Sequence, residues 1–322
     1  MNKITLILPY FGKKFPNTFP LLIDSMKKNI DIQFLIFTNI KDEALESNTS
    51  SNISIEYTTL TNIRELASSK LRVNVNLYTP YKLCDLKPFY GIIFEDYLKK
   101  SDWWGYFDSD IVFGNLSSFI KNDVFKQYDR IFTHGHLTFY RNDKNVNNIV
   151  LHNFSDPAIP EYKRVLTDKE IYGFDEWGFG KNKGRGISWG IDKTKILKQY
   201  DNLSLFADIL PGKFNFEMTS GSKIRYFIYD KGNLSAVKEN NSIINLLYAH
   251  FQKRPMIFKD IDLNKKIYIF PNYFTNEQKY NNSNEEKKRW KNFYLKYRVN
   301  HIIKNLNMSY LKKRVSFINS EK

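Results

Sequence analysis

The sequence predicts an α/β fold in which a mixed, mostly parallel sheet is flanked by helices and followed by a basic helical tail. Two apolar runs, Ile4–Leu8 and Gln33–Asn39, have the length and continuity of buried strands. Between them, Phe19–Asn29 carries apolar residues at helical spacing. Strands that alternate with helices in this way are typical of a largely parallel sheet.

The same alternation continues toward residue 107. Ile53–Tyr57 has the composition of a third strand. Asn62–Leu71 and Lys87–Lys99 are predicted to be helical, and Tyr106–Phe107 is predicted to enter another buried strand. This part of the chain therefore predicts a single sheet with helices packed on it.

The second half of the chain is less regular. Asp230–Asn233 is a strong hairpin signal, and the glycine-rich segment Gly173–Gly190 indicates loops around a pocket. The strands or apolar segments expected in this half are Arg130–His134, Lys223–Tyr229, Leu234–Val237, Ile243–His250 and, as the last strand, Lys265–Phe270.

Composition limits the class of protein. The chain has 322 residues and is 42% apolar, which is enough for a substantial core. Its single cysteine, Cys84, excludes an internal disulfide and fits a reducing cytoplasm. The apolar run before Pro9 is too short for a signal peptide, and no apolar window is long enough to predict a transmembrane helix. We therefore expect a cytoplasmic location.

Positive charge is concentrated at the C-terminus. The whole chain carries a net charge of +15, and residues 282–322 alone carry +8. Asn276–Glu286 is predicted to be a linker, and Arg289–Phe317 to be a basic helix. Such a helix favours an anionic membrane surface, so the protein would be peripheral on the inner face of the membrane. The alternative is a helical hairpin packed on the core.

The stretch from Trp103 to Gly114 contains two carboxylates, Asp108 and Asp110, between apolar and aromatic runs. Residues two apart on a strand share a face, so the carboxylates point together. Converging carboxylates repel each other unless a cation lies between them, and oxygen ligands suit Mg²⁺ or Mn²⁺. The alternative is a turn with two solvated aspartates.

Three candidate segments are expected to meet at one edge of the sheet. Pro9–Gly12 and Asp108–Asp110 each follow a predicted strand, and Thr38–Asn39 is the end of one. Ligands of parallel sheets bind where the strands end, at their carboxyl ends. The sequence therefore predicts a binding site at this edge.

Four segments together resemble bacterial nucleotide-sugar glycosyltransferases of the GT-A fold, of the type encoded in capsule and lipopolysaccharide gene clusters. They are Leu8–Gly12, Pro80–Phe89, Phe107–Asp110 and Tyr248–Arg254. The resemblance covers residues 1–275, which implies a GT-A glycosyltransferase domain, and residues 276–322 form the basic helical extension. It implies transfer of a sugar from a nucleotide-diphosphate donor, with UDP favoured, to a saccharide or lipid-linked acceptor in surface polysaccharide synthesis.

The resemblance also implies a metal site. Asp110 would be the more direct ligand of Mn²⁺ or Mg²⁺, and Asp108 would bind the metal through water or bind the donor ribose. His250 would be the third protein ligand, and Lys253 or Arg254 would face the phosphates, as a late histidine and lysine do in glycosyltransferase family 8. Alternatively, His250 is a capped or surface histidine followed by a solvated turn.

The donor nucleotide is expected near the start of the chain. Pro9, Tyr10, Phe11 and Gly12 would wrap the base, with Tyr10 stacked on uracil. The other residues assigned to the donor, either as hydrogen-bonding groups or as lining of the nucleotide pocket, are Thr38, Asn39, Lys82, Asp85 and Ser109. Lys82 and Asp85 lie one turn apart and can form an ion pair, which is also compatible with a plain surface pair.

Asp175 and Glu176 are the catalytic candidates on the acceptor side, beside Trp177. A carboxylate can act as a base in an inverting transfer or lie near the anomeric carbon in a retaining one. The indole offers a face for a sugar. The alternative is a helix that begins at Asp175 as its cap.

Two further groups are weaker candidates. His134 and His136 could bind metal. The favoured prediction is that one of them contacts the hydroxyls of the donor or acceptor sugar and that the other is structural. Asp192 ranks third among the candidate carboxylates.

Two other classes of function stay open. The positive charge suggests a nucleic-acid-binding protein, but no recognition module is found, so no nucleic-acid partner is expected. A metal-dependent phosphohydrolase would use Asp108 and Asp110, but it ordinarily needs more ligands than five dispersed histidines suggest.

Overall fold

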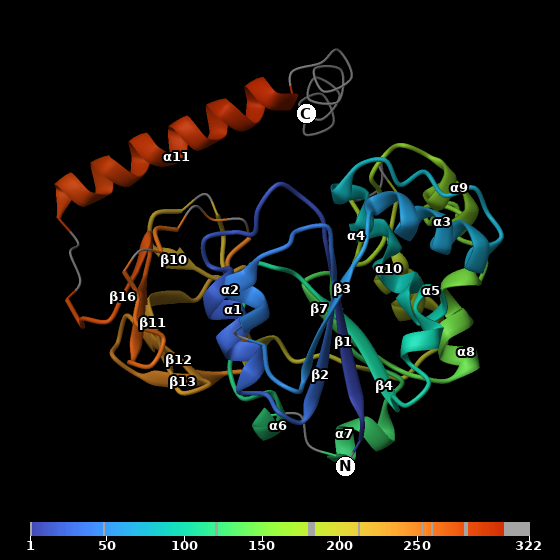
Figure 1. The fold of residues 1–322 in the computed structure, drawn as a ribbon, viewed down its shortest axis with the longest axis horizontal. Coiled ribbons are helices and arrows are strands. Elements are labelled where there is room, and N and C mark those ends of the chain that lie inside the picture. The colour runs from blue at the N-terminus through green and yellow to red at the C-terminus, as the bar shows by residue number, and fades with distance from the viewer. Residues whose placement is uncertain are drawn as a thin grey trace.

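The structure is a computed structural model that describes residues 2–47, 49–119, 122–179, 184–211, 213–252, 254, 256–258, 260–279 and 283–305. It is an α/β protein with a seven-stranded, a six-stranded and a three-stranded sheet (Figure 1). The predicted α/β class, with mixed sheets flanked by helices, is confirmed.

The seven-stranded sheet is the centre of the fold. Its strand order is β3-β2-β1-β4-β7-β6-β8. The strands are β1 (Ile4–Tyr10), β2 (Ile32–Thr38), β3 (Ile53–Tyr57), β4 (Trp103–Phe107), β6 (Arg130–His134), β7 (Leu137–Arg141) and β8 (Gln199–Tyr200). The first four are parallel, β7 is antiparallel to both β4 and β6, and β8 is parallel to β6. The carboxyl ends of β1, β2 and β4 therefore meet at one edge, as expected.

Both faces of the central sheet are buried. Leu6 and Leu8 belong to one hydrophobic cluster and Ile7 to the other. This alternation is what a strand covered on both sides requires. The helices, including the short 3₁₀ turns, are α1 (Phe19–Lys27), α2 (Glu43–Ser47), α3 (Leu60–Leu71), η1 (Pro80–Lys82), α4 (Leu83–Leu86), η2 (Lys87–Phe89), α5 (Tyr90–Ile93), η3 (Glu95–Tyr97), α6 (Leu116–Phe119), α7 (Asn122–Gln127), α8 (Lys144–Asn147), η4 (Asn148–Leu151), α9 (Tyr162–Thr167), α10 (Ile187–Thr194), η5 (Leu203–Leu205) and α11 (Asn284–Asn305).

The helical prediction over Lys87–Lys99 is confirmed in part. The segment is helical to Tyr97, but it forms the short turns η2, α5 and η3 rather than one helix. Pro88 cannot donate a backbone hydrogen bond, which breaks a helix started before it. Gly91 lies so close to Trp104 that an added Cβ would stand 2.6 Å from the indole ring. Close packing against β4 therefore determines the path of this segment more than its helical pattern does.

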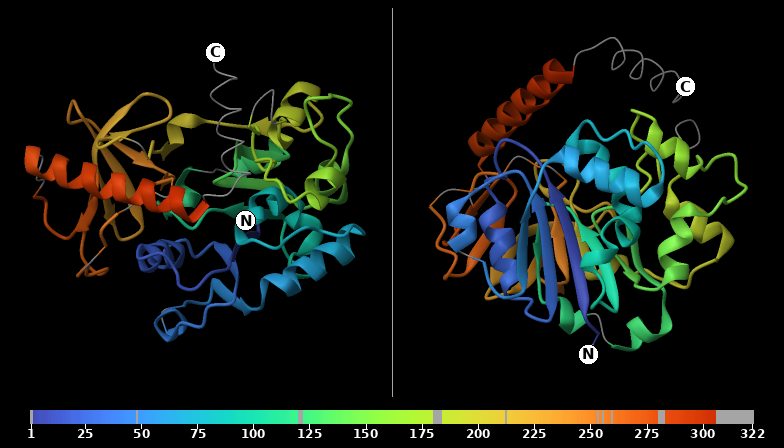
Figure 2. Two further views of the ribbon diagram at one scale, coloured as in Figure 1. Left: turned by 90° about the horizontal axis from the view of Figure 1, so that it is seen from above. Right: turned by 45° about the vertical axis from the view of Figure 1, so that its right-hand side comes forward.

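The six-stranded sheet lies on the α1 side of the central sheet, and α3, α5, α8, α9 and α10 lie on the other side (Figures 1 and 2). Its strands are β10 (Phe216–Glu217), β11 (Lys223–Asp230), β12 (Asn233–Lys238), β13 (Ile243–Leu246), β15 (Ile267–Phe270) and β16 (Tyr273–Thr275). The predicted hairpin is confirmed: Lys231 (φ 48°) and Gly232 (φ 87°) make its two-residue turn. Lys265–Phe270 is not the last strand, because β16 pairs with it.

The apolar segment Ile243–His250 divides between two sheets. β13 stays in the six-stranded sheet, whereas β14 (Tyr248–His250) joins β5 (Ile111–Phe113) and β9 (Phe206–Asp208) in the three-stranded sheet. In this small sheet His250 is paired with Ile111 on one side and with Asp208 on the other. Chain segments far apart in sequence are thereby joined next to Asp110.

The helical tail is confirmed as far as the structure describes it. α11 begins within the predicted linker and runs to Asn305; residues 306–322 lie outside the described part. Trp290 is 4% exposed and packs on Phe214, with ring centroids 5.4 Å apart, and under the Arg254 guanidinium at 5.3 Å. Among the described helices, none is long and apolar enough to cross a membrane.

Candidate functional site

The carboxylates that follow β4 meet the histidine that ends β14. His250 Nε2 lies 3.3 Å from Asp110 Oδ1 and 3.8 Å from Asp108 Oδ2. Backbone pairing fixes this approach, because the amide of Phe251 donates to the carbonyl of Asp110 at 3.0 Å. Asp108, Asp110 and His250, here called the metal cluster, each offer one ligand atom within 4.8 Å of the others.

The electrostatics of the cluster fit a cation. Burial alone would lower the pKa of His250, but the carboxylates of Asp110, Asp208 and Asp108 raise it to about 10. The site therefore has a strong negative potential that a bound proton or a metal ion can neutralise. Two carboxylate oxygens and one imidazole nitrogen are a donor set that suits Mn²⁺ or Mg²⁺.

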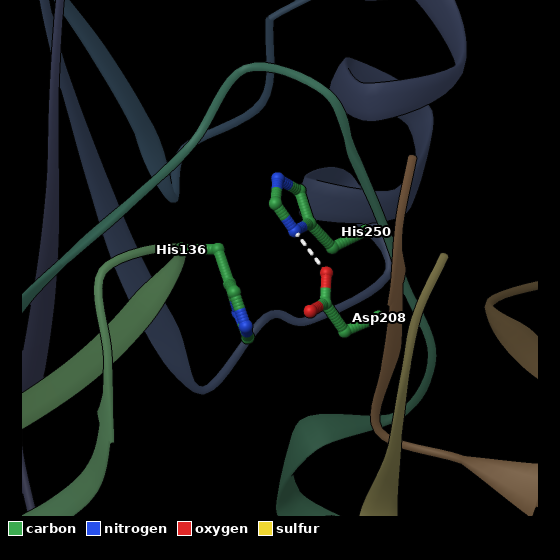
Figure 3. Close-up of side chains that lie close together, drawn as sticks. All are labelled: His136, Asp208 and His250. Carbon is green, nitrogen blue, oxygen red and sulfur yellow. Dashed lines mark hydrogen bonds and ion pairs between the residues drawn. The ribbon is translucent and has the colours of Figure 1, made fainter. Parts of the chain in front are cut away.

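Asp208, which the sequence analysis missed, lies on the other side of His250. Its Oδ1 is 2.8 Å from His250 Nδ1 (Figure 3). The same oxygen also accepts a hydrogen bond from Gln252 Nε2 at 2.7 Å. A carboxylate at Nδ1 holds the proton there and leaves Nε2 available as a ligand. Asp208 is thus placed to orient His250 toward Asp108 and Asp110, the other two residues of the metal cluster.

His136 completes a second group with Asp208 and His250. Its Nδ1 is 2.9 Å from the Tyr248 hydroxyl, and its buried Nε2 makes no hydrogen bond to another described residue. The ring centroids of His136 and His250 are 4.6 Å apart, and one ligand atom from each of His136, Asp208 and His250 lies within 4.8 Å of the others. His136 is therefore a second histidine within reach of a metal ion at this site.

A cavity of about 630 Å³, here called the central cavity, opens over this cluster. It lies between the carboxyl ends of β1 and β4, where the strand order reverses and where ligands of open α/β sheets bind. The candidate site residues that line it are Pro9, Tyr10, Phe11, Asp108, Ser109, Asp110, Asp175, Glu176 and His250.

Three residues predicted to bind the donor do not line the central cavity: Gly12, Thr38 and Asn39. Asn39 accepts a hydrogen bond from the Gly12 amide at 3.0 Å and donates to the Gly12 carbonyl at 2.9 Å. Thr38 is fully buried, and its hydroxyl accepts from the amide of Ile40 at 3.1 Å. The two hydrogen bonds between Asn39 and Gly12 hold the loop that carries Tyr10 and Phe11, whereas the Thr38 side chain contacts its own segment.

Lys82 and Asp85 form the predicted ion pair, at 2.9 Å, but it is buried and does not line the central cavity. Lys82 Nζ also donates to the Val165 carbonyl at 2.8 Å. Asp85 accepts from the amides of Tyr172 and Phe174, each at 3.0 Å. The pair therefore anchors the segment that leads directly into Asp175.

Lys87 is the second functional candidate that the sequence analysis missed. Its ammonium donates to Asp108 Oδ1 at 2.7 Å, to Asp175 Oδ2 at 3.0 Å and to the Gly135 carbonyl at 2.8 Å. Burial would lower its pKa, but the two carboxylates raise the pKa well above its usual range. A Cβ at Gly135 would lie 2.5 Å from Asp175 Oδ2, so only glycine permits this approach.

Asp175 and Glu176 also line the central cavity. Burial raises the pKa of Asp175 to about 7, although Lys87 opposes the rise, and burial also raises the pKa of Glu176. Asp175 does not cap a helix, because α10 begins at Ile187 with Gly186 as its N-cap. Trp177 is absent from this cavity and lines a different one.

Lys253 and Arg254 were the two residues predicted to face the phosphates. Lys253 lies outside the described residues. Arg254 is buried and directed away from the cavity, since its Nε donates to the Pro271 carbonyl at 2.6 Å. Gln252 lines the cavity instead.

Comparison with known proteins adds a family without an assigned activity. Residues 6–278 match the family described as "Family of unknown function (DUF6625)". No curated protein matches the chain. Since the match covers most of its length, the chain belongs to this family of unknown function.

Proposed function

We propose that this protein is a metal-dependent glycosyltransferase of the GT-A type, which transfers a sugar from a nucleotide-diphosphate donor, with UDP favoured, to a saccharide or lipid-linked acceptor. The observation that carries the proposal is the convergence of Asp108, Asp110 and His250 in one cavity at the reversal point of the central sheet. The resemblance of the surrounding segments to such enzymes supports it.

In this proposal the three residues of the metal cluster hold Mn²⁺ or Mg²⁺. A bound divalent ion offsets the charge that builds on the diphosphate as the bond from sugar to oxygen breaks. Tyr10 and Phe11 line the same cavity and provide aromatic surface for the base. The donor would then extend from the N-terminal loop to the metal cluster.

The sugar would lie toward Asp175 and Glu176. Lys87 joins Asp175 to Asp108, so the sugar side and the metal side share one fixed ammonium. The raised pKa of Glu176 suits a carboxylate that takes a proton or faces the anomeric carbon. Both stereochemical outcomes are compatible with this arrangement.

A metal-dependent phosphohydrolase is the second candidate. His134, His136 and His250, three of the five histidines, line the cavity together with Asp208. The fold thus brings together possible metal ligands that are far apart in the sequence, and this supports hydrolysis as the alternative reaction.

The basic tail supports a membrane partner for the enzyme. α11 lies beyond the edge at which the parallel strands end (Figures 1 and 2). Its exposed residues Leu295, Val299 and Ile303 follow one another at four-residue spacing and so form an apolar stripe on one face of the helix. An anionic inner membrane surface would therefore present a lipid-linked acceptor on the side of the central cavity.

The proposal is tested by a donor-cleavage screen. UDP-, GDP- and CMP-sugars are incubated with the protein in Mn²⁺ or in EDTA, and nucleotide and sugar release are measured. We expect slow release of sugar and intact UDP that needs Mn²⁺ and is lost in Asp110→Asn. Release of inorganic phosphate from simple phosphomonoesters, without cleavage of any nucleotide sugar, would favour the phosphohydrolase and contradict the transferase.

A further inference from the structure

A second cavity of about 970 Å³, here called the edge groove, borders β8, the last strand of the central sheet. One part of its lining is Thr133, Trp177 and Asp201, and another part comes from the ends of α7 and α10. None of the candidate metal or donor residues takes part in it. The groove is thus a separate surface that the proposed donor chemistry does not use.

The edge groove and the central cavity share a wall. Glu176 lines the central cavity, and the next residue, Trp177, lines the groove. His134 lines the central cavity, and its Nε2 is 3.2 Å from Asp201 Oδ2 in the groove. Thr133 donates to the same carboxylate at 2.6 Å. A ligand in the groove would therefore have one end beside Glu176.

The unbalanced charge of the groove is positive. Asp201 is engaged by Thr133, and Asp192 is engaged by Lys195 at 2.7 Å. Lys126 and Lys198 also line the groove, and no carboxylate of the described residues lies within ion-pair distance of either ammonium. Both lysines are exposed, so their charge is directed to solvent and to whatever occupies the groove.

We propose that the edge groove binds an extended acidic saccharide, the acceptor of the reaction, with a sugar ring against Trp177 and acidic groups near Lys126 and Lys198. This rests on the proposed function. The indole offers an apolar face with a polar edge, which matches the C–H face and hydroxyls of a sugar ring. Lys126 and Lys198 attract carboxylate or phosphate groups on other sugar units of the same saccharide.

The test uses two defined probes and titration calorimetry of the full chain with UDP and Mn²⁺ present. The acidic probe is a tetrasaccharide of alternating glucuronate and N-acetylglucosamine, and the neutral probe is a tetrasaccharide of N-acetylglucosamine alone. We expect the acidic probe to bind about tenfold more tightly, and its affinity to fall as salt rises.

The variants separate the two parts of the groove. Trp177→Ala should weaken both probes about tenfold, whereas the pair Lys126→Gln and Lys198→Gln should weaken only the acidic probe. The matched control, Lys223→Gln with Lys238→Gln, removes the same charge from β11 and β12 and should change neither. UDP affinity should stay constant in every variant.

Two results would overturn the inference. One is a wild-type protein that binds neither tetrasaccharide at millimolar concentration. The other is a Lys126/Lys198 variant that retains full affinity for the acidic probe. Either result, with Mn²⁺-dependent UDP binding intact, leaves the proposed donor chemistry standing; probe binding without UDP binding would instead remove the proposed function and keep the groove.

Discussion

At the scale of single residues, the site is organised by carboxylates that hold other side chains in place. Asp208 fixes one nitrogen of His250, and Asp175 shares the Lys87 ammonium with Asp108. A partner of this kind determines which imidazole nitrogen carries the proton and which is free to bind a cation. In the proposed function, catalysis would therefore depend on Asp208 and Lys87, which hold the candidate metal ligands in place.

The first prediction concerns Asp208→Asn. Without the carboxylate, the Nδ1 proton of His250 is held less firmly, so Mn²⁺ affinity should fall about 10–100-fold while the fold persists. Calorimetry with Mn²⁺ alone measures the effect, and circular dichroism checks the fold. Asp201→Asn, which removes a carboxylate beside His134 rather than His250, is the control. Equal Mn²⁺ affinity in Asp208→Asn and wild type would exclude the orienting role.

The second prediction is a pH profile. If Glu176 acts as a carboxylate, the rate must fall as pH drops through its pKa, which burial raises above the usual 4.5. Burial also raises the pKa of its neighbour Asp175, to about 7, so the acid limb of kcat/KM should lie above about pH 4.5. Glu176→Gln should abolish transfer and keep UDP affinity. Normal transfer by Glu176→Gln would remove Glu176 from catalysis, and a rate that is constant down to about pH 4.5 would exclude both carboxylates as the titrating base.

At the scale of elements, the three-stranded sheet explains which parts of the site were predictable. Asp108 and Asp110 follow one strand, and the ion pair of Lys82 with Asp85 spans one turn, so local pattern predicts both. The pairing of β14 with β9 joins residues 42 positions apart, and Lys87 contacts a carboxylate 88 positions away. No local periodicity encodes such contacts, and so Asp208 and Lys87 were missed.

The sequence pattern likewise predicts only part of the secondary structure of two other segments. Lys87–Lys99 forms three short turns rather than one helix, with Pro88 at the start of the first and Gly91 packed against Trp104 in the second. The apolar run that ends at His250 was recognised, but its division between two sheets was not. In both cases tertiary packing overrides the local pattern.

The third prediction concerns α11. One face is anchored by Trp290, while Leu295, Val299 and Ile303 are 63%, 44% and 61% exposed. The exposed Lys291, Lys296 and Arg298 lie near this stripe, and each basic residue at an anionic bilayer contributes about 1 kcal/mol. Serine at the three apolar positions should abolish binding to anionic liposomes and leave the fold unchanged.

The control for α11 is serine at Ile30 and Ile243, which are 74% and 62% exposed and lie outside this helix. Substitution is preferable to removal of the helix, because loss of Trp290 would uncover Phe214. Binding by the wild type should also weaken as salt rises, since screening acts over about 8 Å at physiological salt. If wild type ignores anionic liposomes at low salt, or the serine variant binds as well as wild type, the membrane role is lost.

At the scale of the whole molecule, the central cavity, the edge groove and α11 are arranged around one sheet. The parallel strands deliver Tyr10 and Asp108 to one edge, and the three-stranded sheet adds His250 there. The groove along β8 approaches the same site from the side. In the proposed function, donor and acceptor would thus enter from different directions and meet at Glu176.

The central claim is that Asp108, Asp110 and His250 bind a nucleotide diphosphate through a divalent ion. The most direct measurement is UDP binding by calorimetry, in Mn²⁺ and in EDTA, for wild type and for Asp110→Asn. We predict that Mn²⁺ tightens UDP binding by wild type about tenfold or more, and that Asp110→Asn removes this difference. UDP affinity that is the same with metal and with chelator in the wild-type protein would contradict the claim.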